Sequence, residues 1–190
     1  MVLEWDPASA PQRADASVVV AAITDILGGT RLMSVATVCP DGNPWVHNAF
    51  FAFDGDFRLY FLSRPETRHS ENLGADGGRV AASVADSGQA AAPGSRRGLQ
   101  MWGDCRVAAG DTALGRAIAA FSARFPAFAA VAASTAASDP SGRSPRLYVV
   151  TVSAYKLFHE PALGTEVWLS GRVRGDSSLA APAEVVPTTA

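Results

Sequence analysis

The chain has 190 residues, of which 48% are hydrophobic, and a formal net charge of −2 at pH 7. This length suits one domain with a full hydrophobic core, and the charge provides no broad basic surface for nucleic acid or anionic lipid. The apolar run from Val18 to Leu27 is interrupted by Thr24 and Asp25 and is too short to span a membrane. We therefore expect a cytoplasmic protein with no signal peptide and with neither a nucleic-acid nor a membrane partner.

The first half of the chain predicts a helix followed by a three-stranded meander. Residues 15–27 carry apolar side chains at helical spacing and stop at a Gly-Gly pair, a common helix end. Three stretches rich in β-branched and aromatic residues follow, separated by the turns CPDGN and DGD. These predicted strands cover residues 31–38, 44–53 and 57–63. A short helix over about 65–75 and a strand over 79–86 complete this half.

The second half predicts further strands and helices. A long strand over 98–109 contains Gly103, which we interpret as a bulge or bend that helps to close a barrel. An Asp-capped amphipathic helix over 111–125 and a weaker helix after it come before two final strands. Those strands cover residues 146–160 and 166–172. The pattern as a whole predicts a mainly β (α+β) protein, a small antiparallel β-barrel with helical additions.

Both ends of the chain lack a strand or helix pattern. Residues 1–14 are polar and Pro-rich, and residues 175–190 are rich in Pro, Ala, Ser and Thr. Such composition is typical of disordered segments. We therefore predict one folded domain over residues 15–174, flanked by two disordered segments.

Metal, disulfide and hydrolase chemistry have no support in the sequence. Cys39 and Cys105 lack CxxC spacing, and His47, His69 and His159 are scattered without metal-ligand spacing. No G-x-S-x-G stretch and no partnered cysteine occurs. We expect no metal site and no Ser-His-Asp or Cys-His catalysis.

The stretch FLSRPETRHSENL, residues 61–73, turns from a predicted strand into a predicted helix and is crowded with polar groups. Ser63 and Thr67 can donate hydroxyl hydrogen bonds, and Arg68 adds a planar cationic fork beside the free N–H groups of a helix start. These groups together indicate an anion site. A second interpretation needs no ligand, because Ser63 and Glu66 fit a capping box and Pro65 suits a first helical turn.

Several stretches from about residue 15 to 172 resemble, in order and spacing, the pyridoxamine 5'-phosphate oxidase-like FMN-binding split-barrel superfamily. They are MSVATV, CPDGNPW, NAFFAFDG, LYFLS, ETRHSENL, GLQMWGDCRV and EVW. The details NAFFAFD, TRH and LGTEVWL look like a small bacterial branch of it. The resemblance implies a six-stranded antiparallel split β-barrel with two to four flanking helices. It also implies a homodimer with FMN in the grooves between the subunits.

The resemblance also implies a set of cofactor contacts. Thr67 and Arg68 correspond to the family's phosphate-binding pair, with Ser63 and His69 beside them. The strand around Asn48 corresponds to one that lies along the isoalloxazine edge, although its aromatic side chains fit core packing equally well. The implied cofactor-binding residues are Asn48, Phe50, Phe51, Ser63, Thr67, Arg68, His69, Arg97, Gln100 and Trp168.

Three of the implied cofactor-binding residues, Arg97, Gln100 and Trp168, lie in the second half of the chain. Either Arg97 or Gln100 would reach the flavin from the second subunit. Trp168 corresponds to a family tryptophan near the cofactor, and packing at the barrel end explains it as well. Ala52 stands where pyridoxamine phosphate oxidases proper place a lysine, so the resemblance does not imply vitamin oxidation.

The resemblance implies an FMN-dependent oxidoreductase that transfers a hydride or electrons between a small organic substrate and a nicotinamide or oxygen. The flavin would carry the chemistry, so no catalytic acid or base is predicted. Two alternatives stay open. A deazaflavin coenzyme would need a basic groove, for which the candidates are Arg96, Arg97, Arg172 and Arg174. A non-catalytic flavin- or haem-binding protein would use histidines, for which the candidates are His47, His69 and His159.

Overall fold

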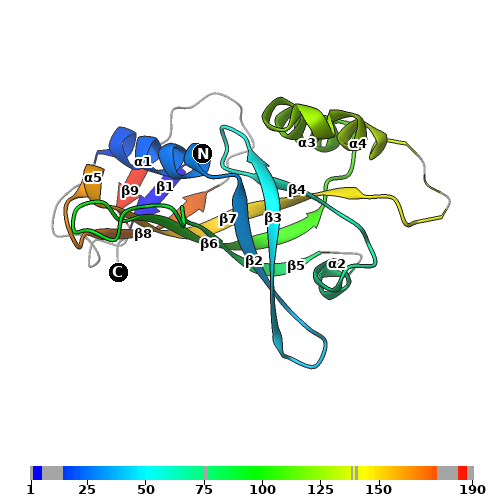
Figure 1. Ribbon diagram of the computed structural model, residues 1–190, viewed down its shortest axis with the longest axis horizontal. Helices are drawn as coiled ribbons and strands as arrows, with labels where there is room; N and C mark the ends of the chain where they lie inside the picture. The colour runs from blue at the N-terminus through cyan, green and yellow to red at the C-terminus, as the bar shows by residue number, and fades with distance from the viewer. Residues whose placement is uncertain are drawn as a thin grey trace. The chain divides into compact units, whose positions relative to one another are not determined.

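The computed structural model of the protein describes residues 2–5, 15–74, 77–137, 139, 141–174 and 184–187. The chain forms two compact units, each assembled from separate stretches of sequence. The first unit contains residues 1–31, 83–102 and 153–190, and the second contains residues 32–82 and 103–152. Figure 1 shows their helices and strands.

The predicted six-stranded antiparallel barrel is confirmed. Its strands follow the order β4-β3-β2-β5-β6-β7, and a further pairing of β4 with β7 closes it. The strands are β2 (Leu32–Val38), β3 (Pro44–Phe53), β4 (Leu59–Ser63), β5 (Gly78–Val84), β6 (Arg97–Val107) and β7 (Arg146–His159). At the closure, Phe61 of β4 lies opposite Tyr148 of β7, and the two rings stack with centroids 5.2 Å apart. Buried aromatic pairs of this kind stabilise the seam of the barrel.

The β2–β3 hairpin follows directly from the turn sequence CPDGN. The Asp41 carboxylate accepts hydrogen bonds from the backbone N–H and the side-chain amide of Asn43, both at 3.0 Å. Gly42 has a φ of 86°, a conformation that other residues rarely adopt. The turn fixes the register, in which Val38 pairs with Pro44 and Leu32 pairs with Phe50.

Gly103 allows β6 to approach the backbone of β7. A Cβ atom at this position would collide with the carbonyl of Thr151 and lie 3.0 Å from the Cα of Val152. The sequence predicted a bulge or bend at Gly103, and the structure shows close backbone approach as the reason for the glycine.

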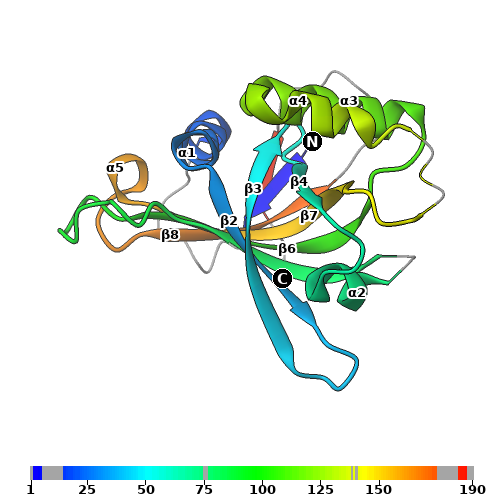
Figure 2. The same cartoon turned by 45° about the vertical axis from the view of Figure 1, so that its right-hand side comes forward.

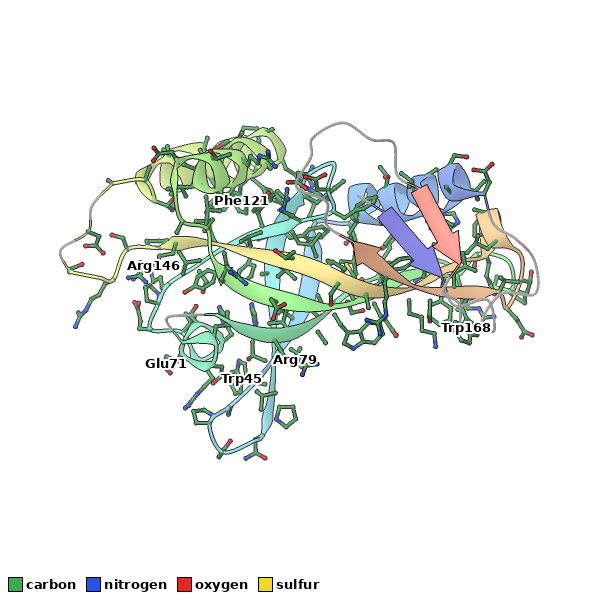
Figure 3. The ribbon with its side chains drawn as sticks, turned by 180° about the vertical axis from the view of Figure 1, so that it is seen from behind. Trp45, Glu71, Arg79, Phe121, Arg146 and Trp168 are labelled. Atoms are coloured by element: carbon green, nitrogen blue, oxygen red, sulfur yellow. The ribbon has the colours of Figure 1, made fainter. Side chains whose placement is uncertain are left out.

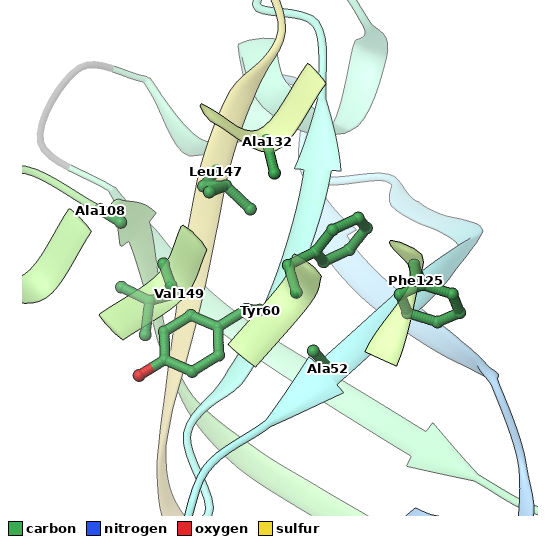
Figure 4. Close-up of a cluster of buried hydrophobic side chains, with 9 residues drawn as sticks. Ala52, Tyr60, Ala108, Phe125, Ala132, Leu147 and Val149 are labelled. Atoms are coloured by element: carbon green, nitrogen blue, oxygen red, sulfur yellow. The ribbon is translucent and has the colours of Figure 1, made fainter. Parts of the chain in front are cut away.

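A helical layer covers one face of the barrel in the second unit. It comprises α3 (Asp111–Arg124), the 3-10 turn η2 (Pro126–Phe128) and α4 (Ala129–Ser134), and α3 and α4 lie together in both Figure 1 and Figure 2. Ala117 and Phe121, one helical turn apart, belong to one buried cluster with Tyr60, Leu147 and Val149. Figure 4 shows the last three of these side chains. Each such buried large side chain contributes about 1.5–3 kcal/mol.

The first unit contains α1 (Ala16–Gly29), which confirms the helix predicted over 15–27. The Asp15 side chain caps this helix by accepting a hydrogen bond of 2.7 Å from the backbone N–H of Ser17. The helix buries Val19, Ala22, Ile23, Ile26 and Leu27. The unit also contains α5 (Glu160–Leu163), which the sequence analysis missed, and β8 (Trp168–Arg174).

Two short strands lie in segments predicted to have no regular structure. Strand β1 (Val2–Trp5) pairs antiparallel with β8 and parallel with β9 (Glu184–Pro187). At these residues the structure has strands in place of the predicted disorder, because backbone pairing of β1 with β8 and of β9 with β1 gives the two stretches an extended conformation that their own sequence does not signal. The rest of the segments 1–14 and 175–190 lies outside the described residues.

Two predicted helix starts differ in the structure. Helix α2 covers only Arg68–Leu73 and has Thr67 as its N-cap, with no side-chain capping bond, so the capping-box interpretation of Ser63 is wrong. Helix α3 has Gly110 as its N-cap, so Asp111 is its first helical residue and not its cap. In both places the turn before the helix, which sequence spacing does not determine, sets the first helical residue.

No helix among the described residues is long and apolar enough to cross a membrane, since the longest, α1 and α3, have 14 residues each.

Candidate functional site

A pocket of about 240 Å³ opens in the second unit, where β3 and the end of β4 meet α2 and the α3–η2 segment. Its polar lining comes from His47, Asn48, Ser63 and His69, and its apolar lining comes from Ala49, Phe50, Leu62, Phe121 and Phe128. Figure 3 labels Phe121 beneath α3. One side of this pocket therefore suits an aromatic group and the other suits hydrogen-bonding groups.

The polar side belongs to a hydroxyl–imidazole cluster formed by Ser63, Thr67, His69 and Ser70. The Ser63 hydroxyl lies 2.6 Å from His69 Nε2 and 3.0 Å from the Thr67 hydroxyl. Thr67 Oγ1 lies 3.1 Å from His69 Nε2 and donates to Ser70 Oγ at 2.9 Å. The cluster contains no carboxylate, and its hydroxyl hydrogens can rotate, so it can turn donors towards an anionic ligand.

His47 and His69 form a stacked pair within the pocket. Their ring centroids are 3.5 Å apart and their planes differ by 8°. Burial, helped by the neighbouring His69, lowers the pKa of His47 to about 4, and burial also lowers the pKa of His69. Both rings are therefore mainly neutral near pH 7.

The two ring nitrogens of His47 are buried and make no hydrogen bond of ordinary geometry with the described residues. A contact with the backbone of Val35, outside ordinary hydrogen-bond geometry, favours the charged form of the ring. Buried polar atoms without partners are uncommon in folded proteins, and one explanation is contact with a ligand. This pair of nitrogens is therefore the clearest local sign that the pocket binds something.

The structure brings five of the predicted site residues together. Asn48, Phe50, Ser63 and His69 line the pocket, and Thr67 joins them through the cluster. Asn48 also accepts a hydrogen bond of 2.7 Å from Ser34 through its side-chain oxygen, which leaves its amide nitrogen to donate.

Arg68 and Phe51 are placed differently. Arg68 is exposed at the start of α2 and forms no ion pair within the described part of the chain. Its charge contributes a minor part of the lowered pKa of Asp41, which results first from hydrogen bonds with Asn43. Phe51 is fully buried, with the Arg124 guanidinium 4.6 Å from its ring centre, because neighbouring residues on a strand face opposite sides. The structure therefore does not bring Phe51 into the pocket.

The remaining three predicted residues belong to the first unit. Arg97 forms an ion pair of 3.0 Å with Asp25, and Gln100 is exposed on β6. The Lys156 ammonium lies 4.2 Å from the centre of the Trp168 ring, whose position on β8 Figure 3 shows. The structure does not bring these three residues together.

The sequence analysis missed three contributors to the site. Phe121 and Phe128 supply the aromatic side, and Ser70 extends the hydroxyl cluster. Ser70 follows Thr67 by three residues, which is one helical turn, so this spacing was a usable signal. Nothing local marks the two phenylalanines, because they reach the pocket only through the packing of α3 and η2 on the barrel.

The chain belongs to the pyridoxamine 5'-phosphate oxidase family, because the sequence pattern of that family matches residues 19–157. This confirms the resemblance seen in the motifs. Among curated proteins, none matches the chain.

Solved structures share the fold at low sequence identity. A heme binding protein from Mycobacterium smegmatis is 18% identical with a TM-score of 0.60, and the match covers 85% of this chain and 59% of that one. The heme storage protein HutZ from Vibrio cholerae is 20% identical with a TM-score of 0.53, over 67% and 85% of the two chains. A protein from Clostridium acetobutylicum related to general stress protein 26 is 12% identical with a TM-score of 0.56, over 84% and 97%. At these identities the likeness shows the fold alone.

Proposed function

We propose that the protein is a cytoplasmic, homodimeric FMN-dependent oxidoreductase acting on a small organic substrate. One observation carries the proposal: in a single pocket, the aromatic side formed by Phe50, Phe121 and Phe128 adjoins the hydroxyl–imidazole cluster. A flavin nucleotide has the matching polarity, with a flat aromatic ring at one end and a phosphate at the other. The family assignment over residues 19–157 supports the same class of ligand.

The size of the pocket supports the homodimer. At about 240 Å³ it is smaller than the roughly 300–1,000 Å³ typical of cofactor sites. A second copy of the chain would therefore complete it. We propose Arg97 or Gln100 as the contact from that copy and Trp168 as a further contact. Phe51, buried on the other side of β3, is not proposed as a contact.

Each pocket residue has a distinct role in the proposal. Ser63 and Thr67 donate hydrogen bonds to phosphate oxygens, and exposed Arg68 supplies the positive charge. Neutral His69 holds the two hydroxyls in place through its Nε2 atom. Asn48 and His47 face the ring, where their nitrogens donate to or accept from its polar edge. Bound FMN would supply the redox chemistry, and the protein would orient it and exclude water.

The experiment is a titration of FMN and riboflavin into wild type and Arg68→Ala, followed by flavin fluorescence. Loss of a charge-assisted contact costs about 1.5–3 kcal/mol, so FMN should bind roughly ten- to a hundredfold more weakly. Riboflavin lacks the phosphate, so its affinity should hardly change. Arg68→Lys should be intermediate, because lysine keeps the charge and loses the planar fork.

Arg79→Ala is the matched control, since Arg79 is an exposed arginine on β5 of the same unit (Figure 3). It should leave both affinities unchanged. Equal losses for FMN and riboflavin in Arg68→Ala, or no loss for FMN, would place the phosphate elsewhere.

A second candidate function is haem binding, and the histidine pair favours it. A neutral imidazole is the form that ligates haem iron, and neither His47 nitrogen makes a hydrogen bond of ordinary geometry with the described residues. His159 is less suited, because its nitrogens already contact Asp25 at 3.0 Å and the backbone N–H of Ala162 at 3.2 Å. If haem binds, His47→Ala should abolish the spectral shift of added hemin and His159→Ala should not.

The deazaflavin alternative has less support. Two of the arginines that would form its basic groove are engaged by carboxylates, Arg96 by Glu160 and Arg97 by Asp25. Titration with the deazaflavin coenzyme alongside FMN tests it directly.

A further inference from the structure

A second pocket in the second unit has no part in the proposed flavin site. Its volume is about 530 Å³, within the range of small-molecule sites, and it shares no lining residue with the pocket at His47. It lies where β4, β6 and β7 meet the start of α3. Three arginines line it: Arg58, Arg106 and Arg116.

Two of these arginines share one carboxylate. Arg58 Nη1 lies 2.6 Å from Oδ2 of Asp56, and Arg116 Nη1 lies 3.6 Å from the same oxygen. Arg58 also lies 3.4 Å from Asp54. The lining residues therefore include three guanidinium groups and no carboxylate, although Asp54 and Asp56 partly offset this charge by pairing with Arg58 and Arg116.

Asp54 is already committed to the turn before β4. Its Oδ1 accepts the backbone N–H groups of Asp56 at 2.9 Å and Arg58 at 3.1 Å, and its Oδ2 accepts the Tyr60 hydroxyl at 2.6 Å. Asp54 thus holds Tyr60 and Arg58 in position rather than filling the pocket. The Tyr60 ring and Val149, both largely buried, give the pocket an apolar floor.

Several donors at the pocket have no partner within the described residues. Arg106 is exposed and forms no ion pair there, and the hydroxyls of Thr112 and Thr151 make no hydrogen bond there. Thr112 lies in the first turn of α3, whose N-cap Gly110 has no side chain to cap the free N–H groups. Asp111 is exposed at the same helix end and opposes an anion, but it does not line the pocket.

We propose that this second pocket binds a small molecule that joins a phosphate group to an apolar ring. The Arg106 guanidinium matches two phosphate oxygens with its planar fork, and Thr112 with the start of α3 donates to the same group. The ring lies on Tyr60 and Val149. The proposal stands independently of FMN binding, because the two pockets share no residue.

Isothermal titration calorimetry with phenyl phosphate tests this site, with phenol and inorganic phosphate as partial ligands. Phenyl phosphate should bind more tightly than either. Arg106→Gln should weaken it roughly tenfold, because a charge-assisted contact is lost. Arg79→Gln is the matched charge control and should not change the affinity.

Thr112→Glu is a second variant, which should preserve the stability of the fold and weaken ligand binding. A carboxylate in the first helical turn favours the helix, so the melting temperature should stay at or above that of wild type. The same carboxylate repels phosphate, so phenyl phosphate should bind at least tenfold more weakly. FMN affinity should be unchanged in Arg106→Gln and Thr112→Glu, which separates this site from the proposed function.

Three results would overturn the proposal. The first is equal phenyl phosphate affinity in wild type and Arg106→Gln. The second is a loss in Arg68→Ala as large as in Arg106→Gln, which would locate the phosphate at the α2 corner. The third is inorganic phosphate binding as tightly as phenyl phosphate, which would exclude a ligand with an apolar ring.

Discussion

Two polar clusters, one in each unit, are partnered in opposite ways. In the first unit the Glu160 side chain is 2% exposed, and its carboxylate accepts hydrogen bonds from Arg96 Nη2 at 2.6 Å and Nε at 3.0 Å. Backbone N–H groups of Gly94, Arg96 and Glu166 also donate to it, at 2.8 to 3.1 Å. These contacts, with Arg96 first, lower the pKa of Glu160 to about 2. This Glu160 cluster is a satisfied buried charge that ties two loops together.

The hydroxyl–imidazole cluster of the second unit has no carboxylate, and the ring of His47 stacked on it has two buried nitrogens that make no hydrogen bond of ordinary geometry with the described residues. The first arrangement leaves nothing for a ligand to satisfy, and the second leaves donors and acceptors at the wall of a pocket. The comparison indicates that the extent of pairing, more than residue type, separates a structural cluster from a binding site.

The largest expected effect is a loss of thermal stability in Glu160→Gln. Removal of this charge leaves Arg96 without its main partner and should lower the melting temperature by several degrees, without changing FMN affinity. Glu166→Gln is the control, because the Glu166 side chain is 83% exposed and lies 3.9 Å from the same arginine. Equal melting temperatures for the two variants would break the contrast between the clusters.

During acid unfolding, Glu160 and His47 should each make stability depend on pH in its own range. The folded pKa of Glu160, about 2, lies below its ordinary 4.5, so its contribution to stability is present above pH 4.5 and lost as the pH falls towards 2. The folded pKa of His47, about 4, lies below its ordinary 6.5, so the unfolded chain binds the proton first. Its effect is therefore a loss of stability as the pH falls from 6.5 to 4.

Urea unfolding at a series of pH values measures both windows. His47→Leu should flatten the dependence between pH 6.5 and 4, and Glu160→Gln should flatten it between pH 4.5 and 2. If His47→Leu leaves the upper window unchanged, the histidine is not buried in its neutral form.

The smallest expected effect is a loss of FMN affinity in Ser63→Ala. Loss of one hydroxyl from the cluster removes about 0.5–1.5 kcal/mol of hydrogen bonding to the phosphate, so FMN should bind roughly two- to tenfold more weakly. The melting temperature should hardly change. Ser95→Ala removes a hydroxyl that donates to the carbonyls of Ala90 and Ala92 in the first unit, and it should leave FMN affinity unchanged. A lower melting temperature with unchanged FMN affinity in Ser63→Ala would mean that the Ser63 hydroxyl stabilises the fold and does not contact the ligand.

Local patterns predicted most of the barrel and part of the site. The turn CPDGN fixed the β2–β3 hairpin, and Ser63, Thr67 and His69 lie within seven residues, so their proximity followed from one strand-to-helix corner. The stacking of His47 on His69 joins two elements, and its effect on pKa depends on burial that no spacing reveals.

The parts that the sequence did not predict depend on distant contacts. Glu160 meets Arg96 across 64 residues, and the second pocket joins Arg58, Arg106 and Arg116 from separate elements. Each of these arginines resembles an ordinary surface charge in the sequence. Strand pairing and helix packing determine which of them meet.

The central claim is that the pocket at the hydroxyl–imidazole cluster binds a flavin nucleotide. The most direct test is the absorption spectrum of the purified protein during titration with FMN and, separately, with hemin. We predict that FMN saturates at one molecule per chain with a shifted flavin spectrum, and that hemin gives only the spectrum of free hemin. No spectral change with FMN, together with a sharp haem band that His47→Ala abolishes, would contradict the claim.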